Sequence, residues 1–296
     1  MSRIFSAGLL LSILASGPVT VPALHAQEQV EVADTVRIDP EPLFTPRDLI
    51  FAGGFVLGTI AMAPLDEYIA EELQDSVRQA NDYLSGTAAA FRVLGHPGAL
   101  YIGSGIYVAG IVADYRPMAD VGLHTVESIL VGEAFTVMIK GLAGRARPFA
   151  DPDDPYNFEL GRGFGNDEFR SFPSGHATAA FAAAAAVTTE MAERFPDRKL
   201  LVGSVMFGGA TMVGISRGYN NEHWASDVVA GAAIGSFAGW KVVHYHHTHP
   251  DNFIDRVLLS TRVVPERGGG VVLAWSLPAA IPAPPPTTLP VLPVLP

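Results

Sequence analysis

Five long apolar stretches without formal charge constrain the fold of this chain more than any other feature. A helix needs roughly 17 to 25 mostly apolar residues to cross a bilayer, and these stretches approach or reach that length. A sixth segment, residues 121–139, is helix-like but contains Glu127 and Glu133, which we expect to make polar contacts inside a bundle. The sequence therefore predicts an all-α, six-helix-type bundle embedded in a membrane. The five stretches are residues 49–65, 93–113, 174–189, 200–216 and 228–240.

The flanking segments predict an exported chain. Arg3 precedes a short apolar run that ends near the small residues Ala23 and Ala26, an order typical of a secretory signal. The segment near the C-terminus is rich in glycine and proline, so we do not expect it to continue a helix or to form part of the core. Residues 271–275 within it could form a short strand. The predicted organisation is a signal peptide at 1–26, a linker at 27–47, a helical domain at 48–250 and a tail at 251–296. Within the domain, the acidic stretch 66–92 predicts a surface helix.

Composition excludes several classes of function. The 296 residues include 19 basic and 30 acidic side chains, and the net charge of −11 argues against binding to nucleic acid. No cysteine is present, which excludes disulfide scaffolds, cysteine-ligated zinc and thiol nucleophiles. Four histidines at 244–249 resemble a metal-binding tract, but we interpret them as a solvated helix end.

Residues capable of phosphate chemistry occur in three groups. Lys140 is followed by Arg147 and Pro148, a second group runs from Pro173 to His176, and a third contains Ser216, Arg217, His223 and Asp227. If the helices alternate in direction, all three groups meet at one end of the bundle. The segment 190–199 then lies at the other end.

The residue types suit an anionic substrate. Ser174 and Gly175 stand where a helix is expected to begin, and the amides and dipole there favour an anion. Three cations, Lys140, Arg147 and Arg217, would add charge complementary to phosphoryl oxygens.

Two histidines could perform the reaction on that anion. His223 and Asp227 are four residues apart, so on one helix they share a face, and the carboxylate could fix the imidazole tautomer. The second ring nitrogen would then be available as a nucleophile or base. His176 could protonate a leaving oxygen.

These eleven residues, at these spacings, resemble the three-part signature of the type 2 phosphatidic acid phosphatase (PAP2) superfamily, which includes bacterial membrane lipid phosphatases, acid phosphatases and vanadium haloperoxidases. The resemblance implies that His223 is the nucleophile, that Asp227 orients it, and that His176 protonates the departing alkoxide. It further implies phosphoryl binding by five residues and no metal or other cofactor. Those five are Lys140, Arg147, Ser174, Gly175 and Arg217.

Several activities share this signature, so the reaction stays open at this stage. We expect a phosphatase that hydrolyses phosphomonoester or pyrophosphate groups of lipids through a phosphohistidine intermediate, in the inner membrane with its site facing the periplasm. The alternatives are a soluble periplasmic acid phosphatase of broad specificity and, third, a vanadate-dependent haloperoxidase. Three complete crossings before the first motif would place the site on the cytoplasmic face, so a periplasmic site requires one early segment not to span.

Overall fold

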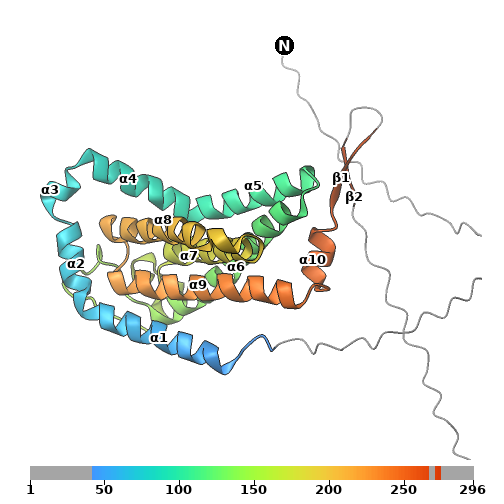
Figure 1. Ribbon diagram of the computed structural model, residues 1–296. Helices are drawn as coiled ribbons and strands as arrows, with labels where there is room; N and C mark the ends of the chain where they lie inside the picture. Colours follow the sequence, from blue (N-terminus) through green and yellow to red (C-terminus); the bar gives the residue numbers. More distant parts are fainter. Residues whose placement is uncertain (1–41, 267–270, 275–296) are drawn as a thin grey trace, which may run out of the picture. The chain divides into compact units, whose positions relative to one another are not determined.

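A computed structural model describes residues 42–266 and 271–274, which form ten α-helices and one β-hairpin. Six of the helices, α1 and α5 to α9, correspond to the six predicted segments, and the all-α prediction is confirmed (Figure 1). The predicted signal peptide, residues 27–41 of the linker, and residues 267–270 and 275–296 of the tail lie outside the described residues. The helices are α1 (Pro46–Met62), α2 (Asp66–Leu73), α3 (Ser76–Gln79), α4 (Asp82–Val93), α5 (Ala99–Val112), α6 (Arg116–Ala143), α7 (Gly175–Arg194), α8 (Lys199–Tyr219), α9 (Ala225–Thr248) and α10 (Phe253–Leu258).

Helix α7 forms the centre of the bundle, where it packs against α6, α8 and α9. Its alanines are buried, and the facing side of α9 carries Gly231, Gly235 and Gly239, spaced by four residues. A methyl group on Gly235 would lie 2.2 Å from the carbonyl oxygen of Thr178, and one on Gly231 would lie 2.3 Å from that of Ser174. Glycine therefore allows the two backbones to approach closely, which fixes the start of α7 against the start of α9.

The stretch 66–92 is not the single surface helix that its amphipathic pattern predicts. It is divided into α2, α3 and α4 because two side chains cap new helices: Asp75 accepts hydrogen bonds from the amides of Val77 and Arg78, and Asn81 caps α4 in the same way. Asp66, the first residue of α2, is fully buried. The prediction was therefore wrong about the continuity of this segment, but its surface position is confirmed, since Asp66 and Ala88 are its only buried residues.

The start of helix α5 also differs from prediction. The chain departs from helical geometry at His96, before Pro97, so α5 begins at Ala99 instead of near residue 93. In the C-terminal segment, the predicted strand is present as β2 (Val271–Ala274), which pairs antiparallel with β1 (Arg262–Pro265). The short helix α10 has no counterpart in the sequence prediction.

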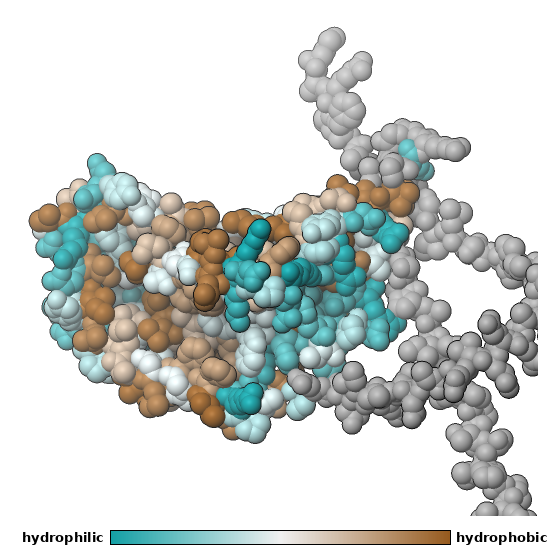
Figure 2. Space-filling view, viewed as in Figure 1, coloured by the Kyte–Doolittle hydropathy of each residue, from teal (hydrophilic) through white to brown (hydrophobic). Residues whose placement is uncertain are grey.

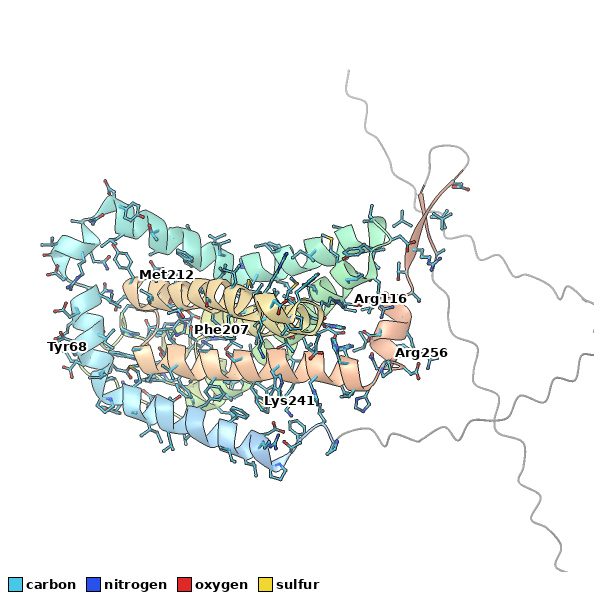
Figure 3. The ribbon with its side chains drawn as sticks, in the orientation of Figure 1. Tyr68, Arg116, Phe207, Met212, Lys241 and Arg256 are labelled. Carbon is cyan, nitrogen blue, oxygen red and sulfur yellow. The ribbon has the colours of Figure 1, made fainter. Side chains whose placement is uncertain are left out.

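The N-terminal helix α1 is attached to α9 by an ion pair. The ammonium of Lys241 lies 2.7 Å from a carboxylate oxygen of Asp48 and 2.7 Å from the carbonyl oxygen of Leu43. In Figure 3, Tyr68 on α2 and Arg256 on α10 lie toward opposite ends of the bundle.

Much of the bundle surface is apolar. Figure 2 shows hydrophobic residues over much of the visible face toward α2 and hydrophilic residues gathering toward α10. Two helical stretches, Pro46–Leu73 and Pro196–Tyr219, are long and apolar enough to cross a membrane. The first of these includes α1, whose outer side chains Leu49, Ile50 and Leu57 are between 67% and 76% exposed.

Candidate active site

A polar cavity of about 210 Å³ lies at the α2 end of the bundle, where α6 ends and α7 begins. Six of the residues predicted from the sequence line it, together with four that were not predicted to do so. The predicted residues are Lys140, Arg147, Gly175, His176, Arg217 and His223, and the additional ones are His96, Glu133, Asp167 and Arg170.

His223 lies in the turn between α8 and α9 and is 3% exposed. The expectation that His223 and Asp227 share one helix was wrong, because α9 begins only at Ala225. Trp224 caps this helix, and its backbone amide donates a hydrogen bond of 2.9 Å to the carboxylate of Asp227 in the first turn. The indole of Trp224 is also fixed, since it donates to the carbonyl oxygen of Ala146 at 2.9 Å.

Asp227 faces the imidazole of His223 and is held from several sides. Its Oδ2 lies 3.7 Å from Nδ1 of His223, which is ion-pair range but longer than a hydrogen bond. Arg145 donates to Oδ1 at 2.6 Å, and the hydroxyl of Ser171 donates to Oδ2. Burial alone would raise the pKa of Asp227, but the Arg145 guanidinium and these hydrogen bonds lower it to about 2. Asp227 is therefore a fixed anion beside the imidazole.

Arg145 connects Asp227 to Asp66, which precedes Arg145 by 79 residues in the chain. One guanidinium nitrogen donates to Asp227 and another donates to Asp66 at 2.8 Å. Asp66 in turn accepts hydrogen bonds from the backbone amide and the hydroxyl of Ser226. All four side chains are at most 2% exposed, so the junction of α1 and α2 is attached directly to the start of α9.

Three cations face the cavity. The ammonium of Lys140 donates to the carbonyl oxygen of Arg170 at 2.6 Å. Arg147 forms an ion pair with Glu222, whose carboxylate also lies 3.8 Å from Arg217. Arg217 is 4% exposed, and its Nε and Nη1 atoms have no hydrogen-bond partner among the described residues. Buried N–H donors of this kind are available to an anionic ligand.

The start of α7 supplies the remaining predicted groups. Gly175 and His176 line the cavity, so the positive end of the α7 dipole faces it. Ser174 does not line the cavity. Its hydroxyl caps α7 at the amide of Ala177, and its own amide donates to the carbonyl oxygen of Asp227 at 3.0 Å. Ser174 therefore joins the two helix starts.

The electrostatic environment keeps the central imidazole neutral. Burial and the nearby charge of Lys140 lower the pKa of His223 to about 3. Burial and Arg147 in turn lower the pKa of Lys140 to about 8. A neutral imidazole beside a cationic ammonium can act as a nucleophile toward a bound phosphoryl group.

Sequence reasoning missed two kinds of site residue. Arg145 lies inside the first motif, and its position between Lys140 and Arg147 could have drawn attention to it. Asp66 and Ser171 carry no local signal, because their role depends on contacts across the bundle. Glu133 was expected to have a polar partner, but its Oε1 has none within the described residues and lies near Gly175.

Comparison with known proteins finds a family match within the chain. Residues 122–251, which contain all three sequence motifs, match the PAP2 superfamily model. The match covers 130 of the 296 residues and confirms the resemblance to this superfamily. Among curated proteins, the lipid A 1-phosphatase of Porphyromonas gingivalis is 45% identical over 69 residues, which cover 23% of this chain and 15% of that protein. The aligned part is thus a small fraction of the relative's length.

One solved structure shares the helical fold of this chain. The transmembrane PAP2-type phosphatidylglycerolphosphate phosphatase of Bacillus subtilis superposes with a TM-score of 0.52 at 22% identity, covering 67% of this chain and 95% of that one. LpxE of Aquifex aeolicus gives a TM-score of 0.45 at 21% identity, covering 61% and 96%. At this identity, the first similarity establishes the helical architecture.

Proposed function

We propose that this PAP2 protein is a membrane phosphatase that removes phosphomonoester or pyrophosphate groups from lipid substrates through a phosphohistidine intermediate. The observation that carries the proposal is the cavity itself. It combines a buried neutral imidazole, a second imidazole and three cations within a volume suited to one phosphoryl group.

In the proposed mechanism, His223 attacks phosphorus through Nε2, because Nδ1 faces the fixed anion of Asp227. The bond from phosphorus to the ester oxygen breaks, and His176, which enters this step as the imidazolium, donates a proton to the departing alkoxide and becomes neutral. Burial and the Arg217 guanidinium lower the pKa of His176 to about 3, so the negative charge of the bound phosphoryl group has to stabilise this imidazolium. Water then attacks the phosphohistidine and transfers a proton to His176, which releases inorganic phosphate and leaves His223 neutral and His176 protonated. Lys140, Arg147 and Arg217 neutralise the charge on the phosphoryl oxygens throughout.

Two features support a lipid substrate. An apolar groove of about 440 Å³ lies between α1 and α9 and includes Phe172 and Pro173, the two residues before Ser174. An acyl chain in this groove would start beside the phosphate cavity. The curated relative is a lipid phosphatase, and two helical stretches can cross a membrane. We place the site on the periplasmic face, in keeping with the secretory signal predicted at 1–26.

The test is release of inorganic phosphate from lipid phosphates, polyprenyl pyrophosphate and a small aryl phosphate, with EDTA present. We expect lipid substrates to be hydrolysed fastest, and we expect His223→Ala and His176→Ala to lose turnover while retaining the thermal unfolding of the parent. His249→Ala, which changes a histidine outside the cavity, is the matched control.

Each other outcome identifies an alternative. Equal turnover of the aryl phosphate would favour the soluble acid phosphatase of broad specificity. Activity that survives His223→Ala would refute the phosphohistidine mechanism. No phosphate release, combined with halide oxidation by peroxide and vanadate, would favour the haloperoxidase.

A further inference from the structure

Six ionisable side chains gather at the end of the bundle opposite the phosphate cavity. They come from α6, α7, α9 and α10. Two of them, His246 and His247, belong to the histidine tract at 244–249 that we interpreted as a solvated helix end. That interpretation was wrong for His246, which is only 4% exposed, because α10 and α6 cover it. The cluster consists of His124, Glu127, Glu190, His246, His247 and Asp255.

Three of these side chains direct one atom each toward a common point. Nδ1 of His246 lies 2.8 Å from Oδ1 of Asp255, and Nε2 of His124 lies 3.4 Å from the same oxygen. All three atoms lie within 4.8 Å of one another. Nitrogen and oxygen ligands at zinc distances of about 2.0–2.2 Å are separated by roughly 3.4 Å in a tetrahedral site, so small side-chain adjustments would suffice.

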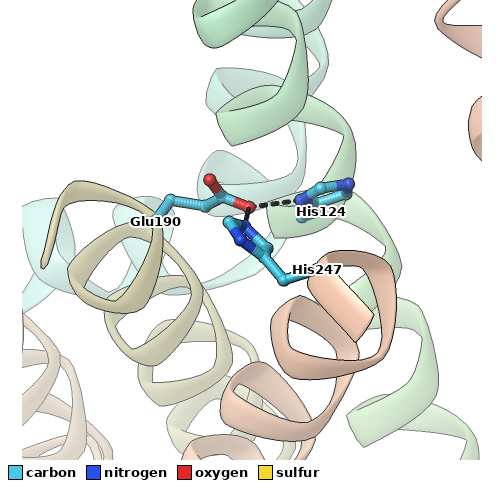
Figure 4. A group of neighbouring side chains, drawn as sticks. All are labelled: His124, Glu190 and His247. Carbon is cyan, nitrogen blue, oxygen red and sulfur yellow. Dashed lines mark hydrogen bonds and ion pairs between the residues drawn. The ribbon is translucent and has the colours of Figure 1, made fainter. Parts of the chain in front are cut away.

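The outward-facing nitrogens of both imidazoles contact carboxylates, of which Glu190 is fully buried and Glu127 is partly buried. Nδ1 of His124 contacts Glu190, which also accepts from His247 at 3.1 Å (Figure 4). Nε2 of His246 contacts Glu127 at 2.5 Å. Metal-binding histidines characteristically donate their second N–H to a carboxylate, which orients the ring and fixes the tautomer with the opposite nitrogen unprotonated. The two carboxylates thus prepare both histidines for coordination.

The third ligand is oriented as well. The side-chain amide of Asn252 donates to Oδ2 of Asp255 at 2.8 Å and to the carbonyl oxygen of His249 at 2.8 Å. The same nitrogen lies 3.2 Å from Nδ1 of His246, a longer contact that coordination of an ion by Nδ1 would replace. Oδ1 of Asp255 consequently remains directed at the two histidines.

The charge of the cluster favours a cation. Three carboxylates, Glu127, Glu190 and Asp255, are accompanied by one guanidinium, that of Arg194, 3.3 Å from Glu190. Two imidazolium ions could balance the excess, but the rings of His124 and His246 stack with centroids 4.1 Å apart, where two positive charges repel. One divalent ion bound by two neutral imidazoles supplies the same charge without that repulsion.

We propose that His124, His246 and Asp255 bind one divalent transition-metal ion, for which zinc is a suitable probe. His124 and Asp255 are 131 positions apart along the chain, so the ion would attach α10 to α6 and α9. Its role is structural, and it is separate from the phosphate cavity. Half-buried His247, whose side chain is 35% exposed, marks the side from which the ion can reach the cluster.

The experiment uses the full, untagged chain, because a histidine tag would itself bind metal. The purified protein is stripped with EDTA, exchanged into metal-free buffer and titrated with zinc. We expect one tightly bound zinc per chain by elemental analysis, and a saturable rise in Tm of at least about 5 °C. Phosphate release in EDTA separates this proposal from the proposed function, since the catalytic mechanism needs no metal.

Variants then locate the ion. Asp255→Asn and His246→Gln are expected to abolish both zinc binding and the zinc-dependent rise in Tm. The matched controls Asp251→Asn and His249→Gln, which change side chains beside the cluster, are expected to retain both. The proposal is overturned if the stripped parent binds less than half an equivalent of zinc or gains no thermal stability. Equal loss of binding in the control variants would also overturn it.

Discussion

Replacing Arg145 with methionine tests the buried ion network that supports the proposed nucleophile. Its guanidinium, 2% exposed, donates to Asp227 at 2.6 Å, to Asp66 at 2.8 Å and to the carbonyl oxygen of Pro155. Arg145→Met leaves two buried carboxylates without their cation. Removing one partner of a buried ion pair costs about 3–5 kcal/mol, and at about 2–4 °C per kcal/mol the expected fall in Tm is roughly 6–20 °C.

The assay is thermal unfolding followed by tryptophan fluorescence at neutral pH. Arg162→Met is the matched control, because this arginine forms an ion pair with Glu159 in which both side chains are more than 40% exposed. Loss of such an exposed pair changes stability little, because solvent screens the two charges. The double variant Arg145→Met/Asp66→Asn removes one of the two buried carboxylates that Arg145→Met leaves unpaired. Its free energy of unfolding should exceed that of Arg145→Met by about 1–3 kcal/mol. Equal losses for Arg145→Met and Arg162→Met, or strict additivity in the double variant, would refute the reasoning.

Two further predictions concern the pH profile and the helix contact. In the proposed mechanism Lys140 binds phosphate only when protonated, so kcat/KM should fall as pH rises through about 8, and Lys140→Arg should move that fall to higher pH. An unchanged pH profile in this variant would contradict the assignment. Gly231→Ala places a methyl group 2.3 Å from the carbonyl oxygen of Ser174 and should cost about 1–3 kcal/mol in chemical denaturation, whereas Gly53→Ala, with nothing within 4 Å, should change little. Equal stability of the two glycine variants would show that α7 and α9 do not need close contact.

Local sequence signals predicted the helices well, because runs of apolar residues and terminal charges report directly on helix formation. They failed where a capping side chain decides the structure. Asp75 and Asn81 divide the stretch 66–92 into separate helices. The capping contact between Trp224 and Asp227 starts α9 at Ala225, which leaves His223 outside the helix. Spacing alone does not distinguish a helical turn from the loop that precedes it.

Long-range contacts limited the prediction of the site in the same way. Residue spacing within the three motifs could indicate which side chains carry charge and proton-transfer chemistry. It could not indicate that Asp66 approaches Asp227 through Arg145, or that His246 is covered by α10. Such partners are separated by 79 residues or more in the chain, or depend on a short helix with a weak sequence pattern.

The position of Asp66 has a consequence for how this protein could be divided or recombined. The family segment begins at residue 122, yet the carboxylate that completes the Arg145 network comes from the start of α2. A chimaera that exchanges residues 122–251 alone would carry Arg145 and Asp227 but would inherit whatever residue the recipient has at position 66. The segment 122–251 is therefore not a transplantable module, and exchanges between relatives should keep the α1–α2 junction together with it.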